Sequence, residues 1–380
     1  MSELYDIFRR HPRISTDTRR IEPGSVFFAL HGATFDGNRF AADALSKGAA
    51  YAVVDDPAAV IGDRTVLVGD TLEALQELAR KHRRELAIPI LAMSGSNGKT
   101  TTKELVSRVL AERFEVYATH GNLNNHIGVP LTLLAMTRDT EFGVVEMGAS
   151  ACGEIALLAS VAEPNYGILT NIGRAHLEGF GGPEGIRRGK GELLDYLAAN
   201  GGRAFVPRED EVLTNMAAER DGLAAEYYSV ALADGIAHHL EGDYNRFNIA
   251  AAMAVGRYFD IDGERIRHAV GSYMPDNNRS QRTETERNTL IVDCYNANPS
   301  SMRASVLNFL AEPAGGRSRR VLILGDMLEL GAWSEQEHRD IVALAGRNPD
   351  TELMLVGGEF ARACTGMEPQ PANTALFPSR

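Results

Sequence analysis

The sequence has few cysteines, no excess of positive charge and no long apolar run. Its three cysteines, Cys152, Cys294 and Cys364, lie far apart and match neither a zinc-binding spacing nor a disulfide framework. Lysine and arginine number 39 against 51 aspartates and glutamates, a net charge of −12, which argues against a broad basic surface for nucleic acid. No run approaches the ~18 apolar residues of a membrane-spanning helix. We therefore expect neither a nucleic-acid partner nor a membrane span.

The N-terminal residues, MSELYDIFRRHPR, contain no apolar stretch that resembles a signal peptide. Together with the isolated cysteines, this favours the reducing cytoplasm. The chain has 380 residues, 44% of them hydrophobic and 24% charged, which is the balance of a soluble globular protein. That length is too great for one ordinary core, so we expect two or three domains.

Short apolar runs of strand length alternate with helical patterns along most of the chain. The expected strands are residues 26–30, 50–54 and 65–68, then 88–94, 142–147 and 165–171, and then 288–293, 320–326 and 352–358. Such alternation predicts an α/β fold. For the strands up to residue 171 it predicts a mostly parallel sheet covered by helices on both faces, and the last three strands resemble a second α/β unit of nucleotide-binding type. The pattern restarts twice, which divides the chain into units at residues 1–85, 86–270 and 271–380.

The strongest motif is a phosphate loop, GSNGKTT, between a predicted strand and a predicted helix. Its residues are Gly95, Ser96, Asn97, Gly98, Lys99, Thr100 and Thr101. Glycines let the backbone turn tightly and direct N–H groups at phosphate oxygens, and the helix N-terminus favours an anion. Lysine would neutralise the β- and γ-phosphates, and Thr100 would offer a hydroxyl to Mg²⁺. The loop is shorter than the general form, because Met93 stands where its first glycine is expected. An unliganded glycine turn is the alternative, but strand, loop, Lys-Thr pair and helix all agree on a phosphate site.

Three further residues have side chains that could serve the same site. Glu146 ends the strand at 142–147, and the carboxyl ends of parallel strands share one edge of a sheet, so it suits a Mg²⁺ ligand. His176 follows the strand at 165–171; a single histidine is more often structural, but its position favours a metal role. Lys190 is predicted to open a helix after a glycine-rich loop. A solvated basic turn beside Arg187 and Arg188 explains Lys190 equally well.

Several motifs, in order along almost the whole chain, resemble the Mur ligase family and, within it, the MurF type. They are STDTRRIEPGSVFFALHGATFDGNRF at residues 15–40, GSNGKTTTKE at 95–104, GNLNNHIGVPLTLL at 121–134, EMGASACGEI at 146–155, TNIGRAHLEGFGG at 170–182, GDYNRFNIAAA at 242–252, DCYNANPSSM at 293–302 and GDMLELG at 325–331. The short phosphate loop is the family's own variant. The YNANP and GDMLELG segments favour the MurF type over its sister ligases.

The resemblance implies a three-domain architecture, with a central phosphate-loop parallel sheet and a Rossmann-like C-terminal domain. The first domain would hold the UDP end of the substrate, the second would bind ATP and Mg²⁺, and the third would close over the site. The chain stops at FPSR, whereas family members run on by at least another strand and helix, so the C-terminal domain is expected to be incomplete.

The resemblance also assigns site residues. Lys99, Glu146, His176 and Lys190 would be catalytic, and Thr100, Glu146 and His176 would hold metal, joined by Lys190 if it carries a carbamate. The nucleotide would bind to the phosphate loop, and it would also contact Asn245, Asn248, Arg279 and Asp293. Substrate would contact Ser15, Thr16, Asp17, Thr18 and Arg19 at its UDP end, the loop residues Asn122, Asn124 and Asn125, and, on the dipeptide side, Asn296, Asn298 and Pro299.

The implied activity is an ATP-dependent, amide-forming ligase of peptidoglycan precursor synthesis. It would join D-alanyl-D-alanine to a UDP-N-acetylmuramoyl-tripeptide through an acyl phosphate, as a monomer, with ATP and Mg²⁺ as cofactors. Three alternatives stay open: a sister ligase that adds an amino acid to a shorter muramoyl peptide or glutamate to folate, a phosphate-loop kinase or motor ATPase, and a non-catalytic nucleotide-binding protein.

Overall fold

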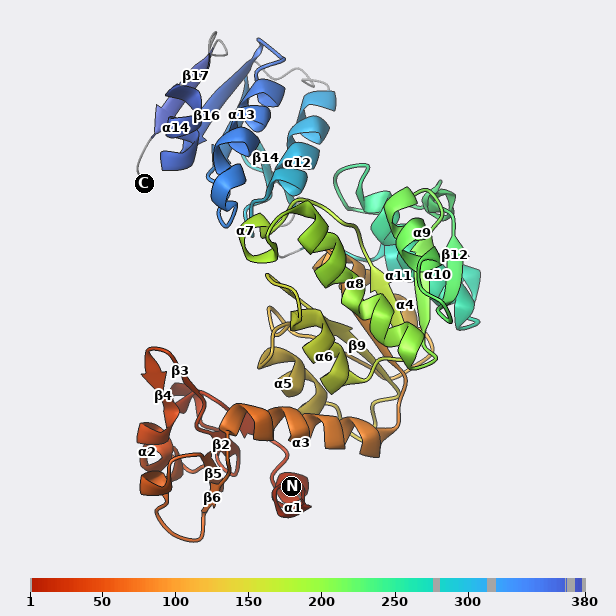
Figure 1. The fold of residues 1–380 in the computed structure, drawn as a ribbon. Helices are drawn as coiled ribbons and strands as arrows, with labels where there is room; N and C mark the ends of the chain where they lie inside the picture. Colours follow the sequence, from red (N-terminus) through yellow and green to blue (C-terminus); the bar gives the residue numbers. More distant parts are fainter. Residues whose placement is uncertain (1, 276–280, 313–318, 366, 368–372, 378–380) are drawn as a thin grey trace.

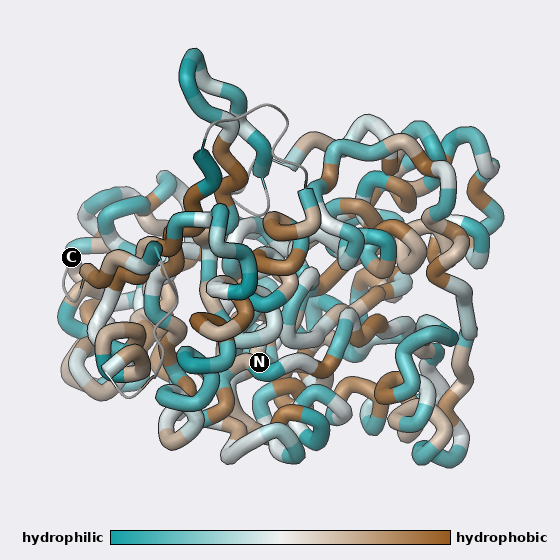
Figure 2. The backbone as a smooth tube through the Cα atoms, turned by 90° about the horizontal axis from the view of Figure 1, so that it is seen from above, coloured by the Kyte–Doolittle hydropathy of each residue, from teal (hydrophilic) through white to brown (hydrophobic). Residues whose placement is uncertain are grey.

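A computed structural model of the protein describes residues 2–275, 281–312, 319–365, 367 and 373–377, and contains three parallel sheets in succession along the chain (Figure 1). No helix in these residues is long and apolar enough to cross a bilayer. Figure 2 shows the backbone from above, and hydrophilic and hydrophobic stretches alternate along it. The parallel α/β class predicted from the sequence is confirmed.

The first sheet is four-stranded and parallel. Its strand order is β1 (Ile14–Ser15), β2 (Val26–Phe28), β5 (Tyr51–Val54), β6 (Thr65–Leu67), and a short antiparallel hairpin, β3 (His31–Gly32) and β4 (Phe35–Asp36), projects from it. Alternate residues of β2 and β5 face opposite sides, as the two-residue period of a strand requires. Phe27 and Val54 pack under α2 (Ala41–Ser46), whereas Phe28 and Val53 face α1 (Ser2–Arg10) and α3 (Thr71–Leu86).

Helix α3 joins the first sheet to the second. It begins where the Asp70 carboxylate accepts a 2.7 Å hydrogen bond from the Glu73 amide, and it ends at Ala87, whose φ of 52° is left-handed. Its apolar face includes Leu75 and Leu78, both fully buried, in a core shared with helices α5 (Gly128–Leu134) and α6 (Glu154–Ala162) of the second sheet.

The central sheet has six parallel strands in the order β12-β11-β10-β7-β9-β8. Their bounds are β7 (Ile90–Ser94), β8 (Val116–Ala118), β9 (Phe142–Glu146), β10 (Tyr166–Leu169), β11 (Arg203–Pro207) and β12 (Ala224–Tyr228). Helices cover both faces: α4 (Lys99–Ala111), α10 (Asn245–Tyr258) and α11 (Gly263–Gly271) on one, and α5, α6, α8 (Pro183–Ala199) and α9 (Glu211–Ala218) on the other. Every residue of β7 and β9 is buried, which explains their nearly continuous apolar sequences. The apolar runs predicted β7, β9 and β10 but not the other three strands.

The third sheet is parallel and consists of β15 (Arg320–Gly325), β16 (Thr351–Val356) and β17 (Thr374–Phe377). It belongs to the C-terminal unit, by which we mean the described elements from β13 to β17. Two features of this unit were not predicted from the sequence. The strand predicted at 288–293, β14 (Thr289–Val292), pairs antiparallel with β13 (Gln281–Glu284) and does not join the parallel sheet. Moreover, helices α12 (Pro299–Ala311), α13 (Ser334–Ala345) and α14 (Gly358–Thr365) bury only one face, so Ile323 on the other is 68% exposed. Successive right-handed crossovers in one direction place all their helices on the same side.

Candidate active site

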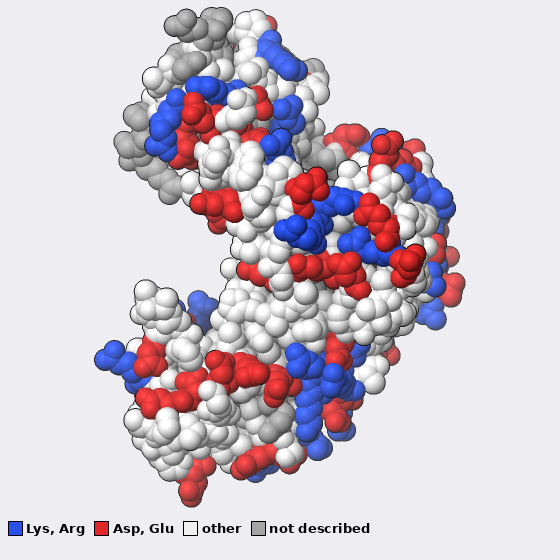
Figure 3. Space-filling model, viewed as in Figure 1, with Lys and Arg blue, Asp and Glu red and all other residues white. Residues whose placement is uncertain are grey.

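A cavity of about 1060 Å³ lies at the carboxyl ends of β7, β9 and β10, between the central sheet and the C-terminal unit. Ligands of open α/β sheets bind at this edge. Fifteen residues proposed from the sequence line it. They are Ser96, Asn97, Gly98, Lys99, Thr100, Thr101, Asn124, Asn125, Glu146, His176, Asn245, Asn248, Asp293, Asn296 and Asn298. Figure 3 shows a hollow in the surface between the first sheet and the C-terminal unit.

The phosphate loop connects β7 to α4 as the motif predicted. Neighbouring strand ends hold its backbone: the Thr170 hydroxyl donates to the Asn97 carbonyl at 2.5 Å, and the Asn97 amide donates to the Asn171 side-chain oxygen at 3.1 Å. The Lys99 ammonium lies over the loop and donates to the Gly95 carbonyl at 2.8 Å. The loop thus curls around the Lys99 ammonium at the amino end of α4. Backbone N–H groups and the helix dipole favour an anion at this place.

Two of the loop's glycines are required by close contacts. Gly95 has a φ of +137°, and a Cβ there would lie 2.0 Å from the Thr170 hydroxyl oxygen. Gly98 has a φ of +78°, and its Cβ would lie 2.7 Å from the Asn248 side-chain oxygen. Both positions combine a left-handed backbone with no room for a side chain, so the glycines shape the loop.

Glu146 stands where β9 ends and is only 2% exposed. Its Oε2 accepts a hydrogen bond from the Thr100 hydroxyl at 3.0 Å, and its Oε1 accepts one from the Asn124 side-chain amide at 2.8 Å. Both donors are neutral. A buried carboxylate between neutral donors, beside a phosphate loop, is a favourable place for a cation.

His176 precedes the short helix α7 (Leu177–Phe180) in a left-handed conformation, with a φ of 55°. Its ring lines the cavity, and its Nδ1 contacts the carboxylate of Glu329 from the C-terminal unit. Helix α7 lies directly against that unit (Figure 1). The structure therefore brings His176 to the same cavity as Glu146.

Lys190 does not open a helix, because α8 already begins at Pro183 and Lys190 lies within it. Nor is it part of a solvated turn: it is 1% exposed, its Nζ donates to the Ala149 carbonyl at 3.0 Å, and the ring of Phe180 lies 5.1 Å away. Burial, reinforced by the charge of Lys99, lowers the pKa of Lys190 to about 7. Lys190 is not a lining residue of the cavity, although Ala149 is.

Asn245 and Asn248 form a buried pair at the start of α10. The Asn248 amide donates to the Asn245 side-chain oxygen at 2.7 Å, and the Asn248 oxygen accepts from the Thr102 hydroxyl at 3.0 Å. These bonds attach α10 to α4 directly beside Gly98. The two asparagines thus line the cavity and also support the phosphate loop.

The C-terminal unit contributes Asp293, Asn296 and Asn298 to the cavity wall. Asn298 caps α12, with Pro299 as the first residue of that helix, and its side-chain amide donates to the Asn97 side chain at 2.7 Å. The unit therefore contacts the phosphate loop itself. Arg279, predicted to reach the phosphates, lies outside the described residues.

The predicted UDP-binding residues are not brought to this cavity. Ser15, Thr16, Asp17, Thr18 and Arg19 form the loop from β1 into a 3₁₀ turn of the first sheet, at Thr18–Arg20. Hydrogen bonding from Arg19 lowers the pKa of Asp17 to about 2. Asn122 and Gly95 are also absent from the cavity lining, and Asn125 uses its side-chain oxygen to cap α5 through the amide of Gly128, at 2.8 Å.

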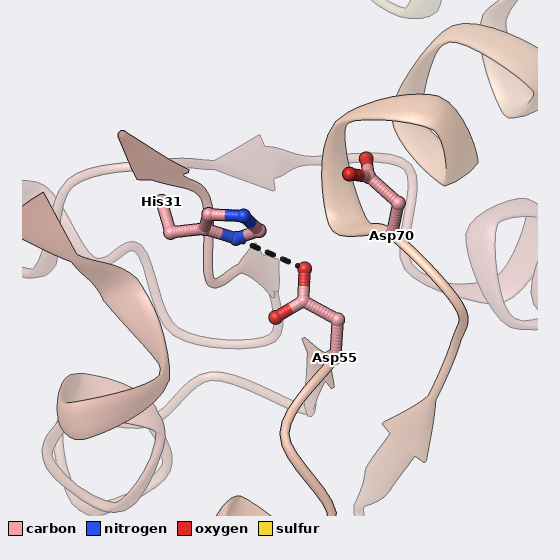
Figure 4. Close-up of side chains that lie close together, drawn as sticks. All are labelled: His31, Asp55 and Asp70. Atoms are coloured by element: carbon pink, nitrogen blue, oxygen red, sulfur yellow. Dashed lines mark ion pairs between the residues drawn. The ribbon is translucent and has the colours of Figure 1, made fainter. Parts of the chain in front are cut away.

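A cluster of His31, Asp55 and Asp70 in the first sheet has ligand atoms close enough for a metal ion (Figure 4). The Asp55 carboxylate is already used: it contacts His31 at 3.1 Å, accepts 2.9 Å bonds from the amide and hydroxyl of Thr71, and accepts a 2.7 Å bond from Asn38. We assign the cluster a structural role, because these bonds attach the β3–β4 hairpin to the start of α3.

Sequence reasoning gave no role to several lining residues. Among them are Thr170, Asn171, Gly173, Tyr244, Tyr295, Ser300 and Glu329. All seven fall inside the motifs quoted above, but a hydroxyl, an amide or a surface carboxylate carries no local pattern that identifies its partner.

Three domain profiles match the chain. The Mur ligase family catalytic domain matches residues 12–83, the Mur ligase middle domain residues 93–239, and the Mur ligase glutamate ligase domain residues 278–372. The UDP-N-acetylmuramoyl-tripeptide–D-alanyl-D-alanine ligase of Bacillus subtilis is 35% identical over 354 residues, which cover 87% of this chain and 77% of the relative. The Escherichia coli ligase of the same name is 34% identical over 370 residues, covering 90% and 81%.

Solved structures agree. A crystal structure of MurF from Acinetobacter baumannii superposes with a TM-score of 0.85 at 30% identity, covering 96% of this chain and 84% of that one. The MurF ligase of Thermotoga maritima, solved in complex with ADP, gives a TM-score of 0.82 at 24% identity, covering 98% and 95%. The similarity to the Thermotoga maritima structure, at 24% identity, shows the fold alone.

Proposed function

The chain belongs to the Mur ligase family and is an amide-forming ligase of peptidoglycan precursor synthesis; we propose that it uses ATP to join D-alanyl-D-alanine to a UDP-N-acetylmuramoyl-tripeptide. The observation that carries the proposal is the cavity itself. A phosphate loop, a buried carboxylate and the C-terminal unit meet there, in a chain 35% identical to a ligase of that name.

ATP is proposed to bind with its phosphates on the loop from Gly95 to Thr101. Lys99 would exchange its bonds to the loop carbonyls for the β- and γ-phosphates. Asn245 and Asn248 would lie near the adenine, with Arg279 and Asp293 reaching phosphate and ribose from the C-terminal unit. The uncharged backbone N–H groups at the start of α4 would donate hydrogen bonds to the same phosphates.

The residues present fit Mg²⁺, which takes oxygen ligands. Thr100 and Glu146 place a hydroxyl and a carboxylate 3.0 Å apart at the end of the phosphate loop, and His176 lines the same cavity. Mg²⁺ held there would neutralise phosphate charge. Lys190 is proposed to carry a carbamate for a second ion. Its pKa of about 7 leaves a large neutral fraction of the amine, which is the form that adds CO₂.

The reaction begins with transfer of the γ-phosphate to the terminal carboxylate of the tripeptide. A carboxylate oxygen attacks phosphorus, the bond to the β-phosphate oxygen breaks, and ADP leaves. The product is an acyl phosphate, whose leaving group is phosphate instead of oxide. The protein's task is to align the two anions and offset their repulsion, and the loop, Lys99 and the α4 terminus would serve it.

The free amine of D-alanyl-D-alanine then attacks the acyl carbon. The tetrahedral intermediate expels phosphate as the amine loses a proton, which leaves the new amide. Water would compete for the acyl phosphate, so the cavity must be covered during the reaction. Asn296 and Asn298, on the C-terminal side of the cavity, are proposed to contact the dipeptide while that unit excludes solvent.

The long nucleotide-linked substrate is proposed to extend across the hollow of Figure 3. Residues Ser15 to Arg19 would hold its UDP end, and the loop containing Asn122, Asn124 and Asn125 would face its peptide. The units at 1–85, 86–270 and 271–380 would then be a UDP domain, an ATP domain and a closing domain. We further propose that the protein acts as a monomer in the cytoplasm.

The test is phosphate release from ATP and Mg²⁺ with UDP-N-acetylmuramoyl-tripeptide, with and without D-alanyl-D-alanine. Release that needs both substrates, with the pentapeptide product detected by mass, is expected. Release with a different acceptor or amine would favour a sister ligase. Hydrolysis independent of both would favour a motor-type ATPase, and nucleotide binding without turnover a non-catalytic protein.

A further inference from the structure

The GDMLELG segment after β15 contains a residue whose contacts reach into the cavity. Glu329 lies there with a φ of 60°, a left-handed conformation that is uncommon outside glycine. Its backbone carbonyl accepts a 3.1 Å hydrogen bond from the Glu178 amide, and its carboxylate contacts the Nδ1 of His176. His176 is itself left-handed. Two strained residues from different parts of the chain therefore meet at one point beside the phosphate loop.

The segment that carries Glu329 is firmly attached to the C-terminal unit. The fully buried ring of His338 accepts a 3.1 Å hydrogen bond from the Met327 amide through Nε2, while its Nδ1–H donates to the Ser334 carbonyl at 2.7 Å. The Asp326 carboxylate accepts 3.0 Å hydrogen bonds from the amides of Glu359 and Phe360 at the start of α14. Glu329 is therefore presented from a supported loop.

The carboxylate of Glu329 determines what the imidazole of His176 can do. An imidazole that gives its Nδ1–H to a carboxylate keeps the lone pair on Nε2, and its ring plane is fixed by the same bond. Nε2 is then the nitrogen left for a metal ion. Carboxylate partners of this kind raise the affinity of metal sites, and their loss typically weakens binding about 10- to 100-fold.

We propose that Glu329 is a positioning residue for the reaction, which fixes the tautomer and orientation of His176 so that Nε2 binds the metal ion that accompanies ATP. The inference rests on the proposed function, because it takes His176 as a ligand. Glu329 belongs to the C-terminal unit and His176 to the loop after β10, so the metal site is complete only when that unit is docked. Other contacts support the docked arrangement: Arg174 pairs with the nearly buried Glu337 at 2.6 Å, and its amide donates to Ser300 at 2.7 Å.

The experiment uses the full chain with ATP and Mn²⁺, a paramagnetic substitute for Mg²⁺. The affinity for Mn²⁺ is measured from the electron paramagnetic resonance signal of the free ion. Nitrogen coordination to Mn²⁺ is measured by electron spin echo envelope modulation. The unmodified protein should show coupling to one imidazole nitrogen, and His176→Ala should remove it. Glu329→Ala should weaken Mn²⁺ binding about 10- to 100-fold and reduce the nitrogen coupling. Glu329→Gln, which can still accept from Nδ1–H, should give a smaller loss.

Glu335→Ala is the matched control, since Glu335 is an exposed carboxylate of the same unit that pairs with Arg339 one turn along α13. It should leave Mn²⁺ affinity and nitrogen coupling unchanged. Full nitrogen coupling with an affinity within twofold of the unmodified protein in Glu329→Ala, shown to be folded by its thermal unfolding, would overturn the proposal. Absence of nitrogen coupling in the unmodified protein would overturn it together with the assignment of His176 as a ligand. Intact nitrogen coupling without substrate-dependent phosphate release would count against the proposed reaction alone.

Discussion

Replacing Gly95 with alanine should disable nucleotide binding while leaving the protein folded. A Cβ at this position would lie 2.0 Å from the Thr170 hydroxyl oxygen and 3.0 Å from the Thr170 amide nitrogen. The backbone φ of +137° adds about 1–3 kcal/mol of strain for any other residue. Relieving the contact by moving Thr170 would also break its 2.5 Å bond to the Asn97 carbonyl, and such overpacking typically costs about 1–3 kcal/mol.

The loop can escape these costs only by leaving the conformation that binds phosphate. The total of about 2–6 kcal/mol is therefore expected mainly as lost affinity, and 2 kcal/mol already corresponds to roughly 30-fold in Kd. The assay is titration of a fluorescent ATP analogue, with thermal unfolding measured on the same samples. Gly62→Ala is the control, because its φ of +107° carries similar strain but no atom lies within 4 Å of the added Cβ. Nucleotide affinity within threefold of the unmodified protein for Gly95→Ala would refute the steric reasoning.

Three further outcomes are expected. Glu146→Gln should raise the Mg²⁺ concentration for half-maximal phosphate release at least about tenfold, since it removes the charge that Thr100 and Asn124 orient; an unchanged Mg²⁺ dependence would contradict the metal role. Burial lowers the pKa of Lys190 to about 7, so the buried amine destabilises the folded protein increasingly as pH falls from about 10.5 toward 7. Lys190→Met should therefore raise the Tm at pH 7, and should raise it less at pH 9.5. Burial also lowers the pKa of His338, which lies near Asp326, Glu359 and Arg362, so this imidazole is protonated at a higher pH in the unfolded chain than in the folded protein. The stability of the folded protein should therefore fall as pH drops below about 6.5. His338→Gln should flatten the dependence of Tm on pH between about pH 5 and 7.

Strong local patterns were enough to predict the phosphate loop and the strands around it. The loop's glycines, Lys99 and Thr100 lie within six residues of one another. Strands β7 and β9 are apolar except for their last residues, Ser94 and Glu146, because both faces of the central sheet are covered. Strand β12, by contrast, is only partly buried for most of its length and has the mixed sequence AAEYY, so no run identifies it. The antiparallel pairing of β14 depends on β13, whose residues Gln281–Glu284 are polar and mostly exposed.

Many residues that line the cavity were singled out from the sequence, but the contacts between them were not. The position of Glu146 at a strand end places it beside Thr100 through the geometry of a parallel sheet. The sequence predicts a helix start at Lys190 after a glycine-rich loop, and Gly189 and Gly191 lie on either side of it. In the structure, these glycines make room for the side chains of Phe180 and Arg220 inside a continuous helix. Contacts such as Glu329 with His176 join residues 153 positions apart. Only the folded chain brings such pairs together.

The most direct test of the central claim follows one oxygen atom. The tripeptide substrate would be prepared with ¹⁸O at both oxygens of its terminal carboxylate and incubated with the protein, ATP, Mg²⁺ and D-alanyl-D-alanine. The released phosphate would then be analysed by mass spectrometry. The acyl-phosphate route predicts one ¹⁸O in each inorganic phosphate formed, in step with the pentapeptide product. Phosphate that carries only solvent or ATP oxygen would contradict the account, because phosphate would then have left without ever bonding to the substrate carboxylate.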